Sequence, residues 1–95
     1  MAEYKLSQEA KNDLIRIYLF GLERFGMSQA EKYYNNLFNC FEMIAQRPFS
    51  FESMEHIKPE YRRCVCGSES IYFKINQEIV EIMAIVGRQD LSQIR

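Results

Sequence analysis

The segment formed by residues 61–90 constrains the fold most strongly, because it contains three β-strand patterns separated by two tight turns. In chain order, the strands and turns occupy residues 61–66, 67–68, 70–75, 76–77 and 79–86. Both turns consist of glycine or polar residues, which interrupt an apolar strand pattern and reverse the chain. The segment therefore predicts a three-stranded antiparallel meander.

Alternation along the second of these strands distinguishes its two faces. The apolar positions are Ile71, Phe73 and Ile75, and the positions between them are Ser70, Tyr72 and Lys74. Successive side chains of a strand point to opposite faces, so the apolar set predicts a face buried beneath other elements. The face with Tyr72 and Lys74 is predicted to stay open and is a candidate binding surface. The third strand is apolar except at Glu81, which is typical of a central strand.

Two amphipathic helices are predicted before the meander. Ser7 is a suitable N-cap for the first helix, which ends at Gly26. Its apolar positions recur at spacings of three and four and are Ala10, Leu14, Ile17, Tyr18, Gly21 and Phe25. Ser28 with Glu31 predicts a capping box for the second helix, which Pro48 terminates. An antiparallel helical hairpin is expected from the seam formed by Ala30, Tyr34, Leu37, Phe41 and Ile44.

The other segments show weaker patterns. Residues 4–6 are predicted to form a short first strand, and residues 47–60 are predicted to be a loop with apolar anchors. These anchors are Phe49, Phe51, Met54 and Ile57. A cluster of aromatic residues at helical spacing is interpreted as hairpin packing rather than a base-stacking platform, and consists of Tyr33, Tyr34, Phe38 and Phe41.

Together the elements predict an α+β fold with the order β-α-α-β-β-β. An N-terminal short strand precedes an antiparallel helical hairpin, which packs on one face of the C-terminal three-stranded antiparallel meander. With 95 residues, the chain has room for a single domain, residues 1–95, and one hydrophobic core. The 47% apolar and 14% aromatic residues supply that core and exclude a disordered chain.

Charge and cysteine content limit the classes of function. A net charge of −1, from 12 basic and 13 acidic side chains, excludes broad salt-driven binding to nucleic acid, so no direct nucleic-acid binding is expected. The longest uncharged apolar run, residues 82–86, is far shorter than the roughly 18 residues of a membrane span, so no membrane partner is expected. An odd number of cysteines and no apolar leader predict reduced thiols and a cytoplasmic location.

Several short segments, taken in order, resemble one family of small bacterial proteins. They are Glu23-Arg24-Phe25-Gly26, Ala30 with Tyr33 and Tyr34, Ala45-Gln46-Arg47-Pro48, Tyr61-Arg62-Arg63, Gly67 with Ile71, Tyr72 and Phe73, Val80-Glu81-Ile82, and Gly87-Arg88-Gln89-Asp90. The ordered set covers nearly the whole chain. It resembles the ParE branch of the RelE/ParE toxins of bacterial type II toxin–antitoxin modules.

This resemblance implies a small cytoplasmic toxin that a cognate antitoxin neutralises by wrapping it with an extended or helical segment. ParE-like members are taken to poison DNA gyrase, so the leading hypothesis is inhibition of gyrase by protein–protein binding, without enzymatic activity. The alternatives are a ribosome-dependent mRNA endonuclease of the RelE type and an inert relative that only binds antitoxin. Val86 stands where many members have a histidine, which favours binding over acid–base chemistry.

The residues expected to contact the target or the antitoxin lie on the meander and at its exit. They are Tyr61, Arg62, Arg63, Tyr72, Lys74, Arg88, Gln89 and Asp90. Arg62 and Arg63 are consecutive on a strand, so their side chains are predicted to point to opposite faces. Only one of the two arginines can then share a surface with Lys74 or Arg88.

No catalytic residue, cofactor or metal site is expected. Ribonuclease chemistry needs a general base, a general acid and a cation, and the candidates His56 and Glu60 are interpreted as solvated loop residues. Cys64 and Cys66, even with Cys40, match the ligand spacing of zinc sites poorly. All three cysteines are interpreted as small buried hydrophobic residues.

Overall fold

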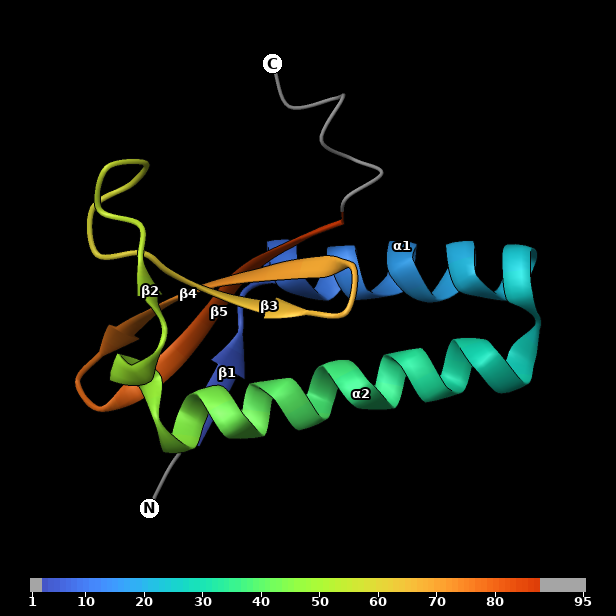
Figure 1. Cartoon of the computed structure of the whole chain (residues 1–95), viewed down its shortest axis with the longest axis horizontal. Coiled ribbons are helices and arrows are strands. Elements are labelled where there is room, and N and C mark those ends of the chain that lie inside the picture. The colour runs from blue at the N-terminus through green and yellow to red at the C-terminus, as the bar shows by residue number, and fades with distance from the viewer. Residues whose placement is uncertain (1–2, 88–95) are drawn as a thin grey trace.

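The computed structural model describes residues 3–87, which form a helical layer packed on a β-sheet (Figure 1). In chain order, the elements are β1 Glu3–Leu6, α1 Gln8–Phe25, α2 Met27–Gln46, the 3-10 helix η1 Pro48–Ser50, β2 Glu52–Ser53, β3 Arg62–Cys66, β4 Glu69–Asn76 and β5 Ile79–Gly87. Both helices pack against the sheet, α1 mainly on β5 and α2 on β1 and β3. The predicted α+β fold, with a helical hairpin on a meander, is confirmed.

The sheet has five strands in the order β1-β5-β4-β3-β2. The strands β3, β4 and β5 form the predicted antiparallel meander. The first strand, β1, pairs in parallel with β5, so the sheet is mixed and β5 has a strand on each side. This central position explains why the sequence of β5 is almost entirely apolar.

The segment between α2 and β3 contains more regular structure than the loop predicted there. It includes η1 and the two-residue strand β2, which pairs with the start of β3. A strand of two residues is too short for alternation to be visible in the sequence. Of the four predicted anchors, Met54 is buried and Phe51 packs on the core, but Phe49 and Ile57 are exposed, and for them the prediction was wrong.

A β-bulge in β5 changes which of its side chains face the helices. Tyr72 of β4 pairs with Ala84 of β5, whereas the next residue, Phe73, pairs with Ile82. The extra residue on β5 shifts the alternation by one position. As a result, Ile82 and Ile85 are both buried on the helix-covered face.

The hydrophobic core lies between the helical hairpin and the sheet. Its largest fully buried side chains are Phe41, Phe73, Leu37, Ile44, Ile71, Ile82, Ile85 and Val80. A chain of aromatic rings extends along the hairpin, with centroid distances of 5.3 Å from Tyr18 to Tyr34, 5.1 Å from Tyr34 to Phe38 and 5.2 Å from Phe38 to Phe41. Aromatic pairs at such distances stabilise a core beyond the area that they bury. The interpretation of this aromatic cluster as packing is confirmed.

The two helices begin in different ways. Ser7 caps α1 as predicted, because its Oγ accepts a hydrogen bond from the Ala10 N–H at 3.0 Å and donates one to the Met83 carbonyl at 2.9 Å. The capping box predicted at Ser28 is wrong, since α2 already begins at Met27 and its N-cap, Gly26, makes no side-chain cap bond. Gly26 has a φ of 89°, which lets one residue connect the two helices.

We expect Ser7→Ala to lower the free energy of unfolding by about 1 kcal/mol, because it removes a capping bond to α1. Ser28→Ala is the matched control. It replaces an exposed serine in the first turn of α2, where no side-chain cap bond exists, and should change stability by less than about 0.5 kcal/mol. Urea denaturation of both variants measures the difference. Equal losses would contradict the assignment of the cap to Ser7.

Two side chains of α1 form hydrogen bonds with the backbone of β5 in the part of β5 that extends beyond β1. The last residue of β1 pairs with Ile82, and β5 continues beyond it to Gly87. The Ile85 N–H donates to Asp13 Oδ2 at 2.9 Å, and Arg16 Nη2 donates to the Ile85 carbonyl at 3.3 Å. Buried backbone groups need hydrogen-bond partners, so these two side chains take the place of a neighbouring strand.

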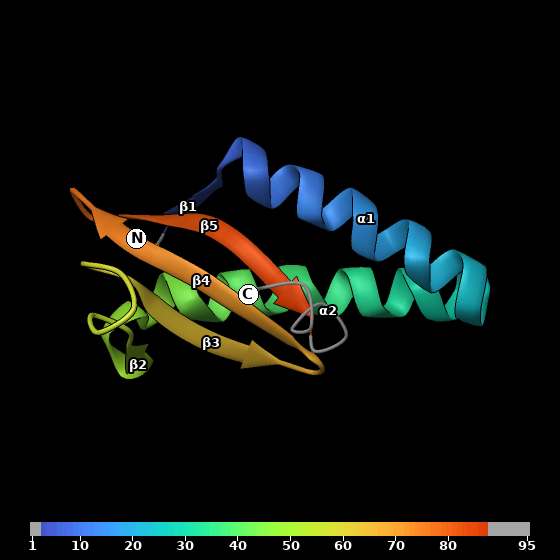
Figure 2. The ribbon, with the colours of Figure 1, turned by 90° about the horizontal axis from the view of Figure 1, so that it is seen from above.

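The helical hairpin is longer than the sheet that it covers. Figure 1 and Figure 2 show both helices continuing past the turn between β3 and β4, so that their connected ends project beyond the strands. Neither helix within residues 3–87 combines the length and apolar character needed to cross a membrane.

Candidate functional site

The open face of the sheet carries three of the residues predicted to form the site. Arg63 of β3 lies opposite Tyr72 of β4 in the strand register, and Lys74 follows on the same face. Arg63 Nη2 donates to Glu52 Oε1 at 2.8 Å, and this hydrogen bond is the main cause that raises the pKa of Arg63. Arg63 is therefore a fixed cation on this face.

Ion pairs balance the other charges of the open face. Glu81 Oε2 lies 3.4 Å from Lys5 Nζ, and Glu81 Oε1 lies 3.9 Å from Lys74 Nζ. Pairs of this kind at a surface add little to stability. Lys5, Lys74 and Arg63 each lie beside a carboxylate. The carboxylates balance these positive charges, so the open face does not carry a large positive patch.

A shallow hollow of about 280 Å³ lies on the open face near the end of β3. Its lining includes Arg63, Val65, Ser70, Tyr72 and Val86. Val65 is 61% exposed although it lies in a strand. Exposed apolar area beside arginine and tyrosine is typical of the centre of protein–protein interfaces. This face is therefore suited to contact with another protein.

The prediction that the two arginines separate is confirmed. Arg62 pairs with buried Phe73 and therefore faces the helix side, where its Nη1 donates to the Phe51 carbonyl at 2.8 Å. Its guanidinium also lies 5.1 Å from the centre of the Phe49 ring. Tyr61 precedes β3, and its ring lies 5.5 Å from Lys58 Nζ. The structure does not bring Arg62 onto the open face with Arg63.

The remaining predicted site residues, Arg88, Gln89 and Asp90, lie outside the described residues. The candidate acid–base residues, His56 and Glu60, lie within the described residues, in the loop between β2 and β3. His56 and Glu60 are exposed there, and the Glu60 N–H donates to Glu55 Oε2 at 2.8 Å. Within residues 3–87, no group of three or more histidine, cysteine or acidic residues is arranged to hold a metal ion.

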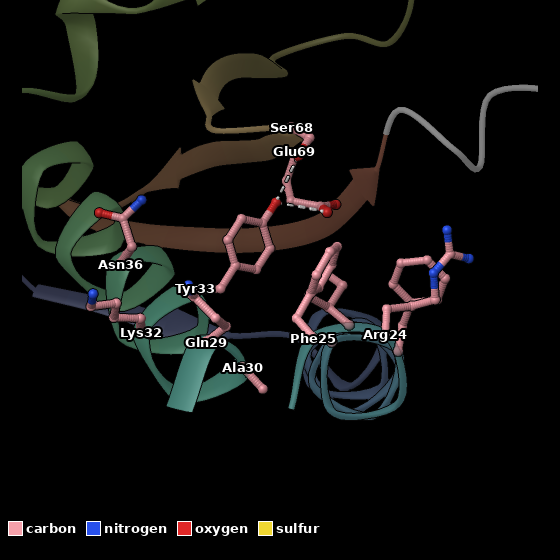
Figure 3. A pocket seen from close by; sticks show the side chains of 12 residues that line it. Arg24, Phe25, Gln29, Ala30, Lys32, Tyr33, Asn36, Ser68 and Glu69 are labelled. Atoms are coloured by element: carbon pink, nitrogen blue, oxygen red, sulfur yellow. Dashed lines mark hydrogen bonds between the residues drawn. The ribbon is translucent and has the colours of Figure 1, made fainter. Parts of the chain in front are cut away.

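A second candidate site is a groove of about 880 Å³ between the projecting ends of the helices and the β3–β4 turn (Figure 3). Its lining includes Phe20 and Gly21 of α1, Ala30 of α2 and Phe25 at the end of α1. The Phe25 side chain is large and apolar, and it is 67% exposed at this groove. The sequence pattern does not predict this groove, because helical spacing places Phe25 in the apolar stripe of the first helix.

Polar groups form the end of the groove next to the sheet. The Tyr33 hydroxyl donates to Glu69 Oε2 at 3.0 Å and lies 3.2 Å from Ser68 Oγ (Figure 3). Burial is the main cause that raises the pKa of Tyr33. Glu69 is only 2% exposed, so this hydrogen bond offsets part of the cost of burying its carboxylate. The rim of the groove carries the cations of Arg24 and Lys32.

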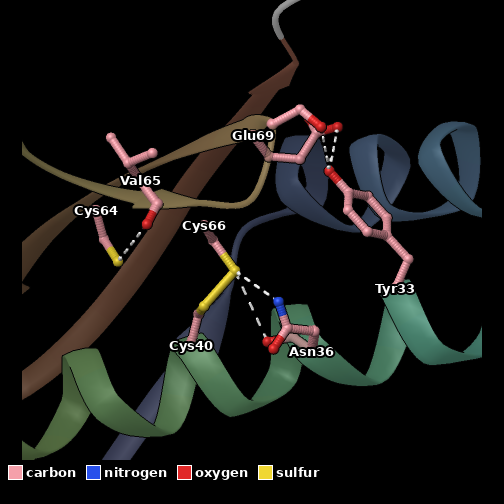
Figure 4. The surroundings of a disulfide bond; sticks show 8 residues. Tyr33, Asn36, Cys40, Cys64, Val65, Cys66 and Glu69 are labelled. Carbon is pink, nitrogen blue, oxygen red and sulfur yellow. Dashed lines mark hydrogen bonds between the residues drawn. A yellow bond between two sulfur atoms is a disulfide. The ribbon is translucent and has the colours of Figure 1, made fainter.

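A disulfide bond between Cys40 of α2 and Cys66 of β3 lies close to this polar end (Figure 4). The prediction of reduced thiols is therefore wrong for these two residues. Spacing in the sequence gave no sign of the bond, because it depends on how α2 packs across β3. Cys64 is a free, buried cysteine as predicted, and burial raises the pKa of its thiol.

Comparison with known proteins identifies the family. The family model described as the ParE toxin of the type II toxin–antitoxin system, parDE, matches residues 4–91. The chain belongs to the ParE toxin family. Toxin ParE1 of Caulobacter vibrioides is 35% identical to this ParE-family chain over 86 residues, which cover 90% of the chain and 88% of that toxin. Toxin ParE1 of Mycobacterium tuberculosis is 29% identical over 77 residues, 81% of the chain and 79% of that toxin.

Two solved structures with the same fold come from toxin–antitoxin systems. A chain of the chromosomal ParDE system from P. aeruginosa superposes with a TM-score of 0.80 at 19% identity, covering 92% of this ParE-family chain and 96% of its own length. A chain of the toxin–antitoxin complex RelBE2 from Mycobacterium tuberculosis has a TM-score of 0.60 at 14% identity, with coverages of 92% and 98%. At these identities, the likeness establishes the fold shared by the ParE and RelE branches.

Proposed function

We propose that this chain arrests bacterial growth by binding DNA gyrase in the cytoplasm, and that a cognate antitoxin protein neutralises it. The observation that carries the proposal is the 35% identity to Toxin ParE1 of Caulobacter vibrioides over 90% of the chain. Inhibition through binding needs a surface rather than a catalytic centre. The two candidate sites provide two such surfaces, one on the sheet and one between the helices.

The open face of the sheet is the surface that we assign to gyrase. Arg63 is held in place by Glu52 and lies opposite Tyr72, so both side chains are ordered before the target binds. Preordered arginine and tyrosine side chains are frequent anchors of protein interfaces. Lys74 extends this surface along β4. Arg88, Gln89 and Asp90 follow β5 in the sequence, and we assign them to the same gyrase-binding surface.

The groove between the helices is the surface that we assign to the antitoxin. Its walls are apolar, its rim is basic at Arg24 and Lys32, and its inner end contains the Glu69 carboxylate. A helix with one apolar face fits a groove of this kind, because the groove buries that face and leaves the polar face in water. The structural neighbours come from a ParDE system and from a RelBE2 toxin–antitoxin complex, which supports an antitoxin as the partner.

Purified gyrase tests the proposed target directly. Adding the chain to a supercoiling reaction is expected to inhibit gyrase and to leave cleaved DNA after protein digestion, because a poisoned gyrase keeps its strand breaks. Expression without an antitoxin should arrest growth with broken chromosomes. Growth arrest with intact DNA and unchanged supercoiling activity would contradict gyrase as the target.

The fold shared with the RelBE2 complex makes messenger RNA cleavage on the ribosome the second candidate. The same expression experiment separates the two functions. A ribosome-dependent nuclease should cut transcripts at defined codons before any DNA damage occurs, and His56→Ala should abolish the cuts. Expression without any toxicity would instead favour an inert relative that only binds antitoxin.

We expect Arg63→Ala to weaken gyrase inhibition at least about fivefold, because truncation of an arginine at the centre of an interface can cost more than about 1 kcal/mol of binding free energy. The fold should stay intact, since the Arg63–Glu52 pair is partly exposed and adds little stability. The measurement is the concentration that halves supercoiling activity, together with thermal unfolding.

Arg62→Ala is the matched control for Arg63→Ala. Arg62 is the neighbouring residue, but it faces the helix side and donates to the Phe51 carbonyl. Its loss should lower the thermal unfolding temperature while leaving gyrase inhibition close to that of the wild type. The reverse pattern, with inhibition lost only in Arg62→Ala, would move the gyrase surface to the other face.

A further inference from the structure

The Cys40–Cys66 disulfide joins the middle of α2 to the end of β3, over a sequence separation of 26 residues. The residues that follow Cys66 are Gly67, Ser68 and Glu69, and the last two line the groove. On α2, Asn36 lies one helical turn before Cys40 and also lines the groove. The bond therefore fixes the β3–β4 turn against the helix that forms one wall of the groove.

Several of the noncovalent contacts between α2 and this turn are polar. The Tyr33 hydroxyl contacts Glu69 and Ser68, and the Asn36 amide donates to Cys66 Sγ at 3.6 Å (Figure 4). Each such hydrogen bond adds only about 0.5–3 kcal/mol of net stability and can be broken without chemistry, whereas the disulfide is covalent. The disulfide is thus the strongest connection between α2 and the turn.

The two bonded cysteines differ in their exposure. Cys66 is 3% exposed, whereas Cys40 is half-buried. Thiol–disulfide exchange needs a thiolate to reach one sulfur atom, so a small thiol attacks at Cys40. Because Cys64 is buried and free, it provides a thiol on the same strand that does not belong to the bond.

We propose that the Cys40–Cys66 bond is a redox latch that holds the groove in its binding shape and opens when a cellular thiol reduces it. In the first step, a thiolate of the glutathione or thioredoxin class bonds to Cys40 Sγ, and Cys66 leaves as a thiolate that takes up a proton. In the second step, another thiol of the same class attacks the mixed disulfide and releases the Cys40 thiol. Two thiols are oxidised to one disulfide, and the protein gains two electrons and two protons.

This latch acts on the groove that we assign to the antitoxin. Its effect on antitoxin binding therefore rests on the proposed function. A preordered surface binds its partner more tightly than one that must be ordered on binding. The oxidised chain should therefore hold the antitoxin more tightly than the reduced chain. In a compartment that keeps thiols reduced, disulfides are usually transient and redox-sensing, which fits a latch rather than a permanent crosslink.

Hydrogen exchange measured by mass spectrometry tests the latch on the chain alone, with and without tris(2-carboxyethyl)phosphine. In the wild type, reduction should speed amide exchange at least tenfold around residues 36–40 and 66–68, while β4 and β5 keep their protection. Cys64→Ala is the matched control and should respond like the wild type. The double variant Cys40→Ala, Cys66→Ala should exchange fast at these segments in both conditions. Unchanged exchange, or an equal loss of protection throughout the chain, would overturn the latch.

Thiol trapping in cells tests whether the latch operates there. Cells expressing the full chain are acidified and alkylated with or without prior treatment by the thiol oxidant diamide. We expect Cys40 and Cys66 to be modified in untreated cells and protected after diamide, and modification in both conditions would overturn the proposal. Neither readout depends on gyrase. A chain that shows the latch without inhibiting gyrase would refute the proposed function alone, and the opposite result would refute the latch alone.

Discussion

Replacing Phe41 with alanine is expected to lower the free energy of unfolding by about 3–5 kcal/mol. The Phe41 side chain is 0% exposed, and its ring centre lies 5.5 Å from that of Tyr4 and 5.2 Å from that of Phe38. Truncation leaves a cavity between α2 and β1 that a close-packed interior fills only in part. Since a small domain has a total stability of about 5–15 kcal/mol, this loss is a large fraction of it.

Phe25→Ala is the matched control, because Phe25 lies on the same helical hairpin but is 67% exposed. Its free energy of unfolding should change by less than about 0.5 kcal/mol. Urea denaturation followed by far-ultraviolet circular dichroism measures both variants. If the two midpoints fell equally, Phe41 would not be a core residue in solution. Phe25 also lines the groove, so Phe25→Ala offers a well-folded variant for binding experiments with an antitoxin.

The second large effect is expected for Asp13→Leu, which should lower the free energy of unfolding by about 2–3 kcal/mol. Leucine has a similar size but cannot accept the hydrogen bond from the Ile85 N–H, which Asp13 Oδ2 accepts at 2.9 Å. The substitution also removes the ion pair between Asp13 and Arg16, in which Asp13 Oδ1 lies 3.3 Å from Arg16 Nη2. Most of the expected loss comes from the backbone N–H of β5, which is left with a poorer partner.

Asp13→Asn separates the two contributions. Asparagine keeps a carbonyl oxygen that can accept the bond from Ile85, but it has no charge for Arg16. Its loss of stability should be less than half that of Asp13→Leu, and the Ile85 amide should keep its protection from hydrogen exchange. Similar losses in both variants would assign the effect to the ion pair instead of the hydrogen bond.

The arrangement of the main elements could be predicted from the sequence because each rests on local periodicity. Alternation at Ile71, Phe73 and Ile75 identified the buried face of β4, and spacings of three and four identified the buried stripes of both helices except at Phe25, which is exposed. The separation of Arg62 from Arg63 followed from the geometry of a strand. Each of these predictions involves residues that are close in the sequence.

The features that were missed depend on contacts between distant segments. The Cys40–Cys66 bond exists because α2 crosses β3, and the groove exists because the hairpin is longer than the sheet. The capping box at Ser28 failed because a single glycine connects the helices and moves the helix start forward. The side chain of Ser28 could have capped a helix, but the turn at Gly26 places Ser28 inside α2 instead of at its N-cap.

The parallel pairing of β1 with β5 also determines when the fold can form during synthesis. Ser7, directly after β1, donates to the carbonyl of Met83, which lies 76 positions later in the chain. A ribosome therefore produces β1 and both helices long before their central partner strand exists, and pairings so distant in sequence form late. A nascent chain without β5 lacks the strand that joins β1 to β4 and completes the sheet beneath the helices. Growth inhibition is thus expected only from chains whose translation has passed β5, and prematurely terminated products should be harmless.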